Sequence, residues 1–156
     1  AKDAARHYCL TNGYGERFPS EITISNDEDG RPFVSGPWDG PLGVSISHKD
    51  DVAVAIVRPG TTPGVDVEKI EPRSERFQSL AYQEEELALL PSENRDEWLT
   101  RLWCAKEAVG KAQGTGLQFN PRKFKADVVD GERICIDGVW TETRILGEYA
   151  VAWTEL

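Results

Sequence analysis

The sequence contains no methionine, not even at its first position, and only three cysteines among its 156 residues. Cys9, Cys104 and Cys135 are odd in number and lack Cys-x-x-Cys spacing, which argues against a disulfide framework and against a zinc site. They are typical of reduced thiols in a cytoplasmic protein. Because the chain starts without Met, in a helix-like run AKDAARHYCL, we expect it to be a segment cut from a longer polypeptide.

Long apolar runs and excess positive charge are also missing. No run of ~18 apolar residues is present, so no membrane-spanning helix and no membrane partner are expected. No signal-peptide pattern appears at the start of the sequence. The 27 acidic residues outnumber the 18 basic ones, which gives a net charge of −9. Since nucleic-acid-binding domains are more often basic, nucleic acid is disfavoured as a partner.

The residues that are present describe an ordinary globular domain, with five Trp, five Phe and four Tyr to fill a core. Hydrophobic periodicity predicts helices at 1–12, 74–90 and 94–113. Alternation predicts strands at 21–24, 42–48, 52–57 and 65–70, then three more at 123–129, 132–140 and 143–153. Asn94, with Glu97 three residues later, predicts a capping box. Short connections between strands favour antiparallel pairing, so the predicted class is α+β.

A faint internal repeat links two of the predicted helices. AKDAARH at 1–7 and AKEAVGK at 105–111 both read Ala-Lys-acid-Ala, with a basic residue or His four places after the acid. Seven residues are few enough for chance to explain the match. If the repeat reflects a duplication, the chain forms two similar α+β lobes, approximately 1–60 and 61–156, packed as a pseudo-dimer. A site could then lie in the crevice between them.

The helix predicted at 94–113 carries charged residues where its apolar spacing predicts burial. The residues that mark its core face are Trp98, Leu102, Ala105, Val109 and Ala112. Trp103, Glu107 and Lys111 follow one another at intervals of four and share a neighbouring face. A solvated Glu–Lys pair, worth ~0.2–0.5 kcal/mol, explains this spacing without any site.

A second cluster of charge lies in the predicted strand at 65–70. Asp66 and Glu68 point to one side of that strand, while Val65 and Val67 point to the other. Two adjacent carboxylates repel each other unless water or a cation separates them. Mg²⁺ fits, because it takes one to three carboxylates and completes its octahedron with waters and phosphate oxygens. A strand end that enters water is an equally supported alternative.

Two shorter motifs and one cysteine complete the set. SISH at 45–48 closes a strand, so that Ser47 and His48 can donate to a phosphate or simply lie in an exposed turn. DGRP at 29–32 is most simply a turn, with Arg31 as a candidate to bind a phosphate or a base. A Cys-His or Ser-His-Asp set is formally available, but no GxSxG elbow is present, and a core-facing Cys104 is typical of inert packing.

Together these motifs resemble the signature of the 4'-phosphopantetheinyl transferase superfamily. GVDVE at 64–68 is followed, forty residues from Asp66 to Lys106, by WCAKEAVGK at 103–111, and every required position is filled. DGRP and SISH upstream, and GTGL with Pro121 and Phe124 downstream, also match this family in order. The resemblance covers nearly the whole chain and favours the two-lobe, surfactin-synthetase-activating type.

The resemblance implies an enzyme that transfers 4'-phosphopantetheine from coenzyme A to a serine of an apo acyl or peptidyl carrier protein, with Mg²⁺ as cofactor and 3',5'-ADP as second product. Asp66, Glu68 and Glu107 would surround the metal. Glu107 would also act as general base toward the carrier serine, with Asp66 and Lys111 beside it in the catalytic group.

The resemblance further implies a binding site for coenzyme A. Two lysines would hold its phosphates, a Ser-His pair would contact the 3'-phosphate, and a Gly-Arg-Pro segment would border the adenine and ribose phosphate. In this sequence the matching residues are Gly30, Arg31, Pro32, Ser47, His48, Lys106 and Lys111.

Some features depart from the two-lobe type or support other functions. The chain begins late relative to that type, so its N-terminal lobe would be incomplete. Its AKDAAR start is also similar to transferase domains fused to polyketide synthases, which makes a non-catalytic carrier-docking lobe of such a synthase the alternative function. A phosphohydrolase built on Asp66 is weaker, because DVEKI lacks the usual Asp-x-Asp pattern. The candidates for carrier contact are Arg101 and PRKFK at 121–125, although a solvated strand start is at least as well supported.

Overall fold

Two separate antiparallel sheets organise the chain in this computed structural model, which describes residues 1–117 and 120–156. The first sheet has the order β1-β2-β3-β4, with bounds Thr23–Asn26, Pro32–Ser35, Leu42–Lys49 and Val52–Pro59. The second sheet has the order β5-β9-β8-β7-β6. Its strands are β5 (Pro63–Lys69), β6 (Ala126–Asp130), β7 (Arg133–Ile136), β8 (Val139–Leu146) and β9 (Tyr149–Glu155). We call the part from α1 to β4 the N-lobe and the part from β5 to β9 the C-lobe.

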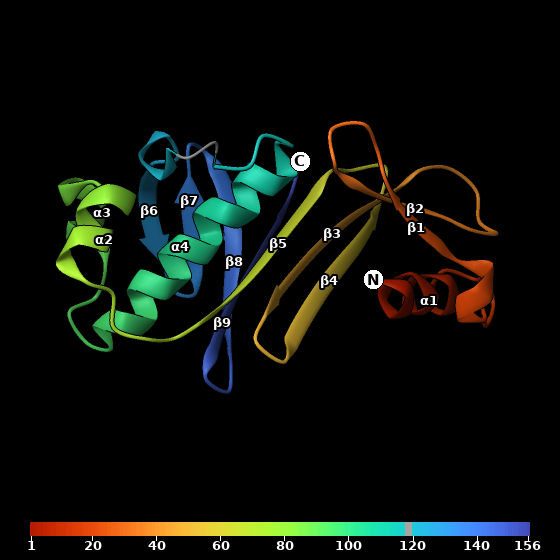
Figure 1. Cartoon of the computed structure of the whole chain (residues 1–156), viewed down its shortest axis with the longest axis horizontal. Helices are drawn as coiled ribbons and strands as arrows, with labels where there is room; N and C mark the ends of the chain where they lie inside the picture. Colours follow the sequence, from red (N-terminus) through yellow and green to blue (C-terminus); the bar gives the residue numbers. More distant parts are fainter. Residues whose placement is uncertain (118–119) are drawn as a thin grey trace.

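The N-lobe packs one short helix, α1 (Lys2–Thr11), against its sheet (Figure 1). Ala5 and Cys9 of α1 are fully buried, since they lie four residues apart on one face of the helix. The buried apolar residues that form this core are Ala5, Ile22, Val34, Leu42, Val44 and Val57. The short 3₁₀ helix η1 (Pro19–Glu21) connects α1 to β1. This small core holds the β1–β2 hairpin and strand β3 in place.

In the C-lobe a long helix, α4 (Arg95–Ala112), lies across the second sheet. Helices α2 (Glu75–Ala81) and α3 (Glu84–Leu89) lie beside β6, at the side of this lobe away from the N-lobe (Figure 1). The short 3₁₀ helix η2 (Pro121–Lys123) leads into β6. Helix α4 lies very close to β5, because Gly64 has no side chain: a Cβ there would lie 1.8 Å from the carbonyl oxygen of Ala108. This contact brings the acidic strand and the charged helix together.

These findings confirm the predicted α+β class and the order helix, strands, helices, strands. The two lobes, each with an antiparallel sheet and a helix against it, fit the predicted pseudo-dimer layout. Within residues 1–117 and 120–156, no helix combines the length and the apolar character that a membrane crossing requires.

Two helix predictions were wrong. The single helix predicted at 74–90 is interrupted, because Tyr82 and Gln83 adopt extended backbone between α2 and α3. The Tyr82 ring is buried by this break, and its hydroxyl donates to the Leu99 carbonyl at 2.8 Å. The capping box predicted at Asn94 is also absent: Asn94 has φ +51° and makes no side-chain cap to α4.

The C-terminal strands were predicted at the right place but with the wrong number. Four strands, β6 to β9, occupy the region where three runs were predicted. The extra turns lie at Asp137–Gly138 and at Gly147, where all three residues have positive φ. The predicted runs at 132–140 and 143–153 crossed these two turns, because strand-forming residues flank both of them closely.

Candidate active site

Along the buried part of α4, a single stripe of side chains reaches the surface. Between Leu99 and Ala112 every residue of this helix is buried except Trp103, Glu107 and Lys111, which are partly exposed. Their spacing of four places them one above the other on one face. The prediction that these three residues share a face is therefore confirmed, and the stripe faces the strand that carries the two acids.

Asp66 lies at the centre of the site and is only 5% exposed. Its Oδ1 atom accepts two hydrogen bonds, from Ser47 Oγ at 2.7 Å and from Lys111 Nζ at 2.8 Å. Lys111 Nζ also donates to the Val65 carbonyl at 3.1 Å. The other oxygen, Oδ2, is buried and has no partner among the described residues. These contacts rule out the alternative that Asp66 sits at a strand end in water.

Glu68 lies two residues further along β5, with a cation on each side. Lys49 Nζ, at the end of β3, is 2.9 Å from Glu68 Oε2, and Arg73 Nη2 is 3.7 Å from the same oxygen. The adjacent Glu68 carboxylate raises the pKa of Lys49, so this ammonium stays protonated. The Arg73 guanidinium lies over the Phe77 ring, 5.1 Å from its centroid. Glu68 thus connects the N-lobe, strand β5 and the segment before α2.

Glu107 completes the group of acids, and its environment favours the protonated form. Burial is the main cause that raises its pKa, followed by the charge of the Asp66 carboxylate; Lys111 opposes this effect and Glu68 adds to it. The resulting pKa is about 7, instead of 4.5. Three carboxylates that influence one another in this way form an anionic site that a cation would stabilise.

The donor set suits a hard divalent ion. Three carboxylates supply oxygen ligands, and the orphaned Asp66 Oδ2 lacks only a positive partner. In the described part of the chain, no three His, Cys, Asp or Glu side chains are already placed so that they could hold a metal ion together. Lys111 and Lys49 lie beside two of the carboxylates instead. Magnesium binding by Asp66, Glu68 and Glu107 therefore remains a proposal that their chemistry fits.

A cavity of about 690 Å³ opens between the two lobes beside this site. Lys111 lines it from α4, and the Gly114–Gly116 turn lines it just beyond the end of that helix. Gly30 and Arg31 line it from the β1–β2 loop and Pro32 from the start of β2; Asp27 Oδ1 accepts from the Arg31 amide at 2.8 Å and holds the loop closed. The turn predicted at DGRP is therefore confirmed, and it forms part of the wall of an inter-lobe cavity.

One of the contacts between the lobes at this cavity requires a glycine. Gly114 has φ +68°, and a Cβ there would lie 2.4 Å from the guanidinium carbon of Arg31. The Arg31 side chain therefore packs directly on the turn that ends α4. Figure 1 shows the β1–β2 loop and the C-terminal end of α4 at the same edge of the molecule. Arg31 and Lys111 bring positive charge to the cavity from opposite lobes.

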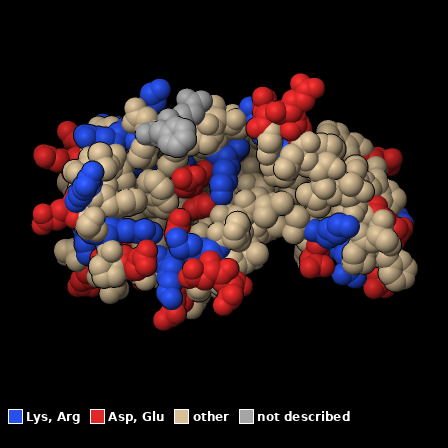
Figure 2. Space-filling view, viewed as in Figure 1, with Lys and Arg blue, Asp and Glu red and all other residues tan. Residues whose placement is uncertain are grey.

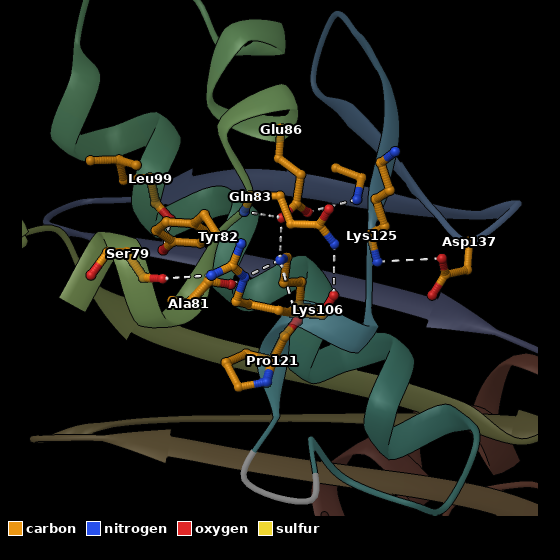
Figure 3. A network of polar contacts seen from close by, with 12 residues as sticks. Ser79, Ala81, Tyr82, Gln83, Glu86, Leu99, Lys106, Pro121, Lys125 and Asp137 are labelled. Carbon is orange, nitrogen blue, oxygen red and sulfur yellow. Dashed lines mark hydrogen bonds and ion pairs between the residues drawn. The ribbon is translucent and has the colours of Figure 1, made fainter. Parts of the chain in front are cut away.

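Lys106 does not belong to this surface, and its predicted role in binding coenzyme A phosphates does not fit the structure. Its side chain is 0% exposed. The ammonium group donates to Glu86 Oε2 at 2.8 Å, to the Ala81 carbonyl at 3.0 Å and to the Pro121 carbonyl at 3.3 Å (Figure 3). All three of its protons are thus used inside the C-lobe. The reason is helical geometry: residue 106 is next to Glu107 in sequence but points to a different side of α4.

The partner of Lys106 is equally buried. Glu86 is 0% exposed, its Oε2 also accepts from the Gln83 amide at 2.7 Å, and its Oε1 accepts from the Ala126 amide at 2.7 Å. Figure 3 shows this network between α2, α3, η2 and α4. Burial lowers the pKa of Lys106, while Glu86 opposes that effect. The pair therefore fixes the helices of the C-lobe and the start of β6 in one arrangement.

Ser47 and His48 separate in the structure, because successive side chains of a strand point to opposite faces. Ser47 is buried against Asp66, whereas His48 is exposed. His48 shares its face of β3 with Ile46, which lines the cavity, but His48 itself is not among the lining residues. Ser47 has no cavity-lining surface either.

Two other candidates are buried. The Cys104 thiol donates to the Ala150 carbonyl at 3.4 Å, and burial raises its pKa well above the ordinary value, so it is an inert core thiol and not a nucleophile. Arg101 is 5% exposed and donates to Thr143 Oγ1 at 2.8 Å, which rules it out as a carrier contact. From the segment 121–125, Arg122, Lys123 and Lys125 are exposed.

Sequence reasoning missed two residues that shape the site, Lys49 and Arg73, and it also missed Glu86, the buried partner of Lys106. Lys49 directly follows SISH and Arg73 ends GVDVEKIEPR, so both lie inside stretches that already drew attention. Glu86 gave no usable signal, because it is the last of three consecutive glutamates and only the break between α2 and α3 turns it inward.

Comparison with known proteins agrees with these features. The family model described as the 4'-phosphopantetheinyl transferase superfamily matches residues 62–154. The chain is 34% identical over 140 residues to the 4'-phosphopantetheinyl transferase pptA of Paxillus involutus, covering 76% of this chain and 53% of that protein. It is 31% identical over 120 residues to the phosphopantetheinyl transferase of a Thraustochytrium species, covering 65% of this chain and 41% of that protein.

A third relative is the 4'-phosphopantetheinyl transferase HetI of a Nostoc species, 28% identical over 115 residues, covering 69% of this chain and 48% of that protein. The chain thus spans about half the length of the curated relatives it matches. The matched segment holds β5, α4 and the acids and lysine that they bring together. This chain belongs to the 4'-phosphopantetheinyl transferase superfamily.

Proposed function

We propose that this protein transfers the 4'-phosphopantetheine group of coenzyme A to a serine of an apo acyl or peptidyl carrier protein. One observation carries the proposal. The paired Asp66 and Lys111 lie close to the partly exposed Glu107, and Lys111 lines a cavity of about 690 Å³ that both lobes border. A transferase that must hold coenzyme A and admit a second macromolecule needs such a combination of cavity and open edge.

The reaction forms one bond and breaks another. The carrier serine oxygen attacks the phosphorus attached to pantetheine, and the bond from that phosphorus to the bridging oxygen of the pyrophosphate breaks. 3',5'-ADP leaves with the bridging oxygen, and holo carrier remains. Phosphoryl transfer of this kind requires in-line positioning and neutralisation of charge more than covalent help from the protein.

Each residue of the site has a role in that scheme. Glu107 accepts the serine proton, directly or through a water. Lys111 lies at the cavity wall, where its ammonium can turn from Asp66 to a phosphate oxygen. Arg31, with Gly30 and Pro32 on the N-lobe side, borders the nucleotide.

Magnesium would be held by Asp66, Glu68 and Glu107 and, when bound, supplies a Lewis acid that neutralises the pyrophosphate oxygens. Ordinary residues of the chain do the rest: they bind the nucleotide, orient the carboxylates and take the serine proton. Three free, buried cysteines suit a reducing compartment, which supports cytoplasmic localisation.

The test is an intact-mass measurement of the carrier. The protein is incubated with an apo carrier protein, coenzyme A and Mg²⁺, and we expect the carrier to gain the mass of one phosphopantetheine. The gain should vanish with Glu107→Gln. Carrier binding without any mass gain would contradict the proposal and favour a non-catalytic docking lobe, while phosphate release without carrier would favour a hydrolase.

A further inference from the structure

The geometry points to Ser47 as a positioning residue that orients Asp66, and not as a contact of the coenzyme A 3'-phosphate. This inference rests on the proposed function, because it concerns how the reaction's metal-binding carboxylate is held. It starts from the boundary between the two lobes, where strand β3 of the N-lobe lies against strand β5 of the C-lobe.

Two serine hydroxyls replace a backbone ladder at this boundary. Strand β5 uses one edge to pair with β9, while β3 pairs with β2 and β4. Between β3 and β5, Ser45 Oγ accepts from the Val65 amide at 3.0 Å and Ser47 Oγ donates to Asp66 Oδ1 at 2.7 Å. The two serines are 4% and 8% exposed. Consecutive residues of β5 are thus tied to alternate residues of β3.

The Ser47 bond determines which oxygen of Asp66 remains available. Oδ1 accepts from both Ser47 and Lys111, whereas Oδ2 is buried without any partner in the described residues. Two donors on one oxygen resist rotation of the carboxylate, so that Oδ2 is held in a fixed direction. A buried carboxylate oxygen without a donor is costly unless a cation completes it.

The same bond leaves Ser47 unsuited to a phosphate. A serine hydroxyl has one proton, and Ser47 donates it in a hydrogen bond to Asp66. The lone pairs that remain on Ser47 Oγ would repel a phosphate oxygen. Ser45 and Ile46 line the inter-lobe cavity, but Ser47 does not. Its side chain is instead buried against Asp66. Loss of the hydroxyl should therefore disturb the metal-binding carboxylate and leave recognition of the 3'-phosphate unchanged.

The experiment compares Ser47→Ala with Ser47→Thr, which keeps a hydroxyl on a strand, and with Ser25→Ala as a matched control. Ser25 lies in β1 of the same sheet and does not line the cavity. Circular dichroism and thermal unfolding first establish that each variant is folded. Mn²⁺ affinity is then measured by electron paramagnetic resonance in the presence of 3',5'-ADP, a readout that needs no turnover.

We expect Ser47→Ala to weaken Mn²⁺ binding by about tenfold or more, as is typical when a residue that orients a metal ligand is lost. Ser47→Thr should recover most of this affinity, and Ser25→Ala should match the wild type. In transfer assays, the ratio of kcat/KM for coenzyme A to that for 3'-dephospho-coenzyme A should be the same in Ser47→Ala as in the wild type.

Two results would overturn the inference. One is unchanged Mn²⁺ affinity in Ser47→Ala. The other is a selective loss of the preference for coenzyme A over its 3'-dephospho form, which would make Ser47 a phosphate contact. A failure of the proposed function is distinguishable from both, because it would appear as wild-type protein that binds Mn²⁺ but modifies no carrier, and the Mn²⁺ comparison would still decide the role of Ser47.

Discussion

The two lobes share an architecture but differ in what holds them together. The N-lobe buries a few apolar residues under a ten-residue helix, and Figure 2 shows that the middle of its visible surface is largely uncharged, with acids at the β1–β2 loop and charges of both signs over α1. The C-lobe buries a much larger core under α4 and shows mixed acidic and basic side chains on the same face. It also encloses the Lys106–Glu86 ion pair.

This difference separates two tasks. The C-lobe supplies the groups that would do the chemistry, Asp66, Glu68, Glu107 and Lys111, from a strand and a helix packed tightly at Gly64. The N-lobe supplies a cavity wall and single contacts to that chemistry through Ser47, Lys49 and Arg31. Substitutions in the C-lobe should therefore affect rate and stability, while those at the boundary should affect ligand affinity.

The largest effect is expected for Glu107→Gln on the rate of transfer. Glutamine cannot accept the serine proton, so kcat should fall by about 10²–10⁴-fold, the usual contribution of a general base. The measurement is the initial rate of holo-carrier formation. As the N-lobe counterpart, Asp29→Asn at the cavity rim should change kcat by less than about threefold. Equal losses in both variants would contradict the division between lobes.

The second largest effect is expected for Lys106→Met on stability. This substitution leaves the Glu86 carboxylate buried without its cation, which should lower the free energy of unfolding by about 3–5 kcal/mol. The double variant Lys106→Met with Glu86→Gln should recover part of this loss. In the N-lobe, Lys2→Met removes an exposed lysine bonded to the Pro19 carbonyl and should cost less than about 0.5 kcal/mol.

Urea unfolding measures these changes, and coenzyme A affinity of the folded protein gives a second readout. If Lys106 bound a coenzyme A phosphate, the double variant would stay folded yet bind coenzyme A far more weakly. We expect its affinity to stay close to that of the wild type.

Two glycine substitutions test the contact of Gly114 with Arg31 at the boundary between the lobes. Gly13 and Gly114 both have positive φ, so alanine at either position should cost about 1 kcal/mol of stability. A Cβ at Gly13 meets open space, whereas one at Gly114 would displace the Arg31 guanidinium. Only Gly114→Ala should raise KM for coenzyme A, by about tenfold, equivalent to one charge-assisted hydrogen bond. Identical KM values would show that Arg31 does not contact the nucleotide.

The smallest effect concerns pH. The folded state raises the pKa of Glu107 to about 7, so between the unfolded value of 4.5 and about 7 the folded protein binds more protons. This contribution to stability is present below pH 4.5 and is lost as pH rises through 7. In metal-free buffer, Glu107→Gln should therefore be more stable than wild type at pH 8, by about 1–2 kcal/mol after allowance for partial exposure, and equal to it at pH 4.5.

Thermal or urea unfolding at both pH values gives this difference. Glu93→Gln, an exposed acid before α4, is the matched control and should show no such pH-dependent gain. A stabilisation of Glu107→Gln that was the same at both pH values would exclude titration as its cause.

How far the sequence predicted this site depended on the range of the interactions involved. Period and spacing are local, so the face shared by Trp103, Glu107 and Lys111 and the pairing of Asp66 with Glu68 on β5 could be predicted. Lys106 could not be separated from Glu107 by motif alone. The direction of the Lys106 side chain also follows from helix geometry. Its partner Glu86, however, comes within reach only because the chain is extended at Tyr82 and Gln83.

The same limit applies to the fold. The class followed from alternating helix and strand signals, whereas the extra strand among β6–β9 depended on positive φ at Asp137 and Gly147, in turns too short to interrupt the strand signal. The contact of Ser47 with Asp66 joins residues nineteen apart across two lobes. Such a contact is set by packing between sheets, which the order of residues within either strand does not reveal.

Each of the three acids at the site already has its own form of neutralisation. Asp66 has Lys111, Glu68 has Lys49 and Arg73, and Glu107 has a tendency to keep its proton. If magnesium binds here as proposed, it would take over the neutralisation of these carboxylates, and Glu107 would release its proton. Lys111, at the cavity wall, would then be free to meet the pyrophosphate, so that binding of the metal would favour binding of the nucleotide.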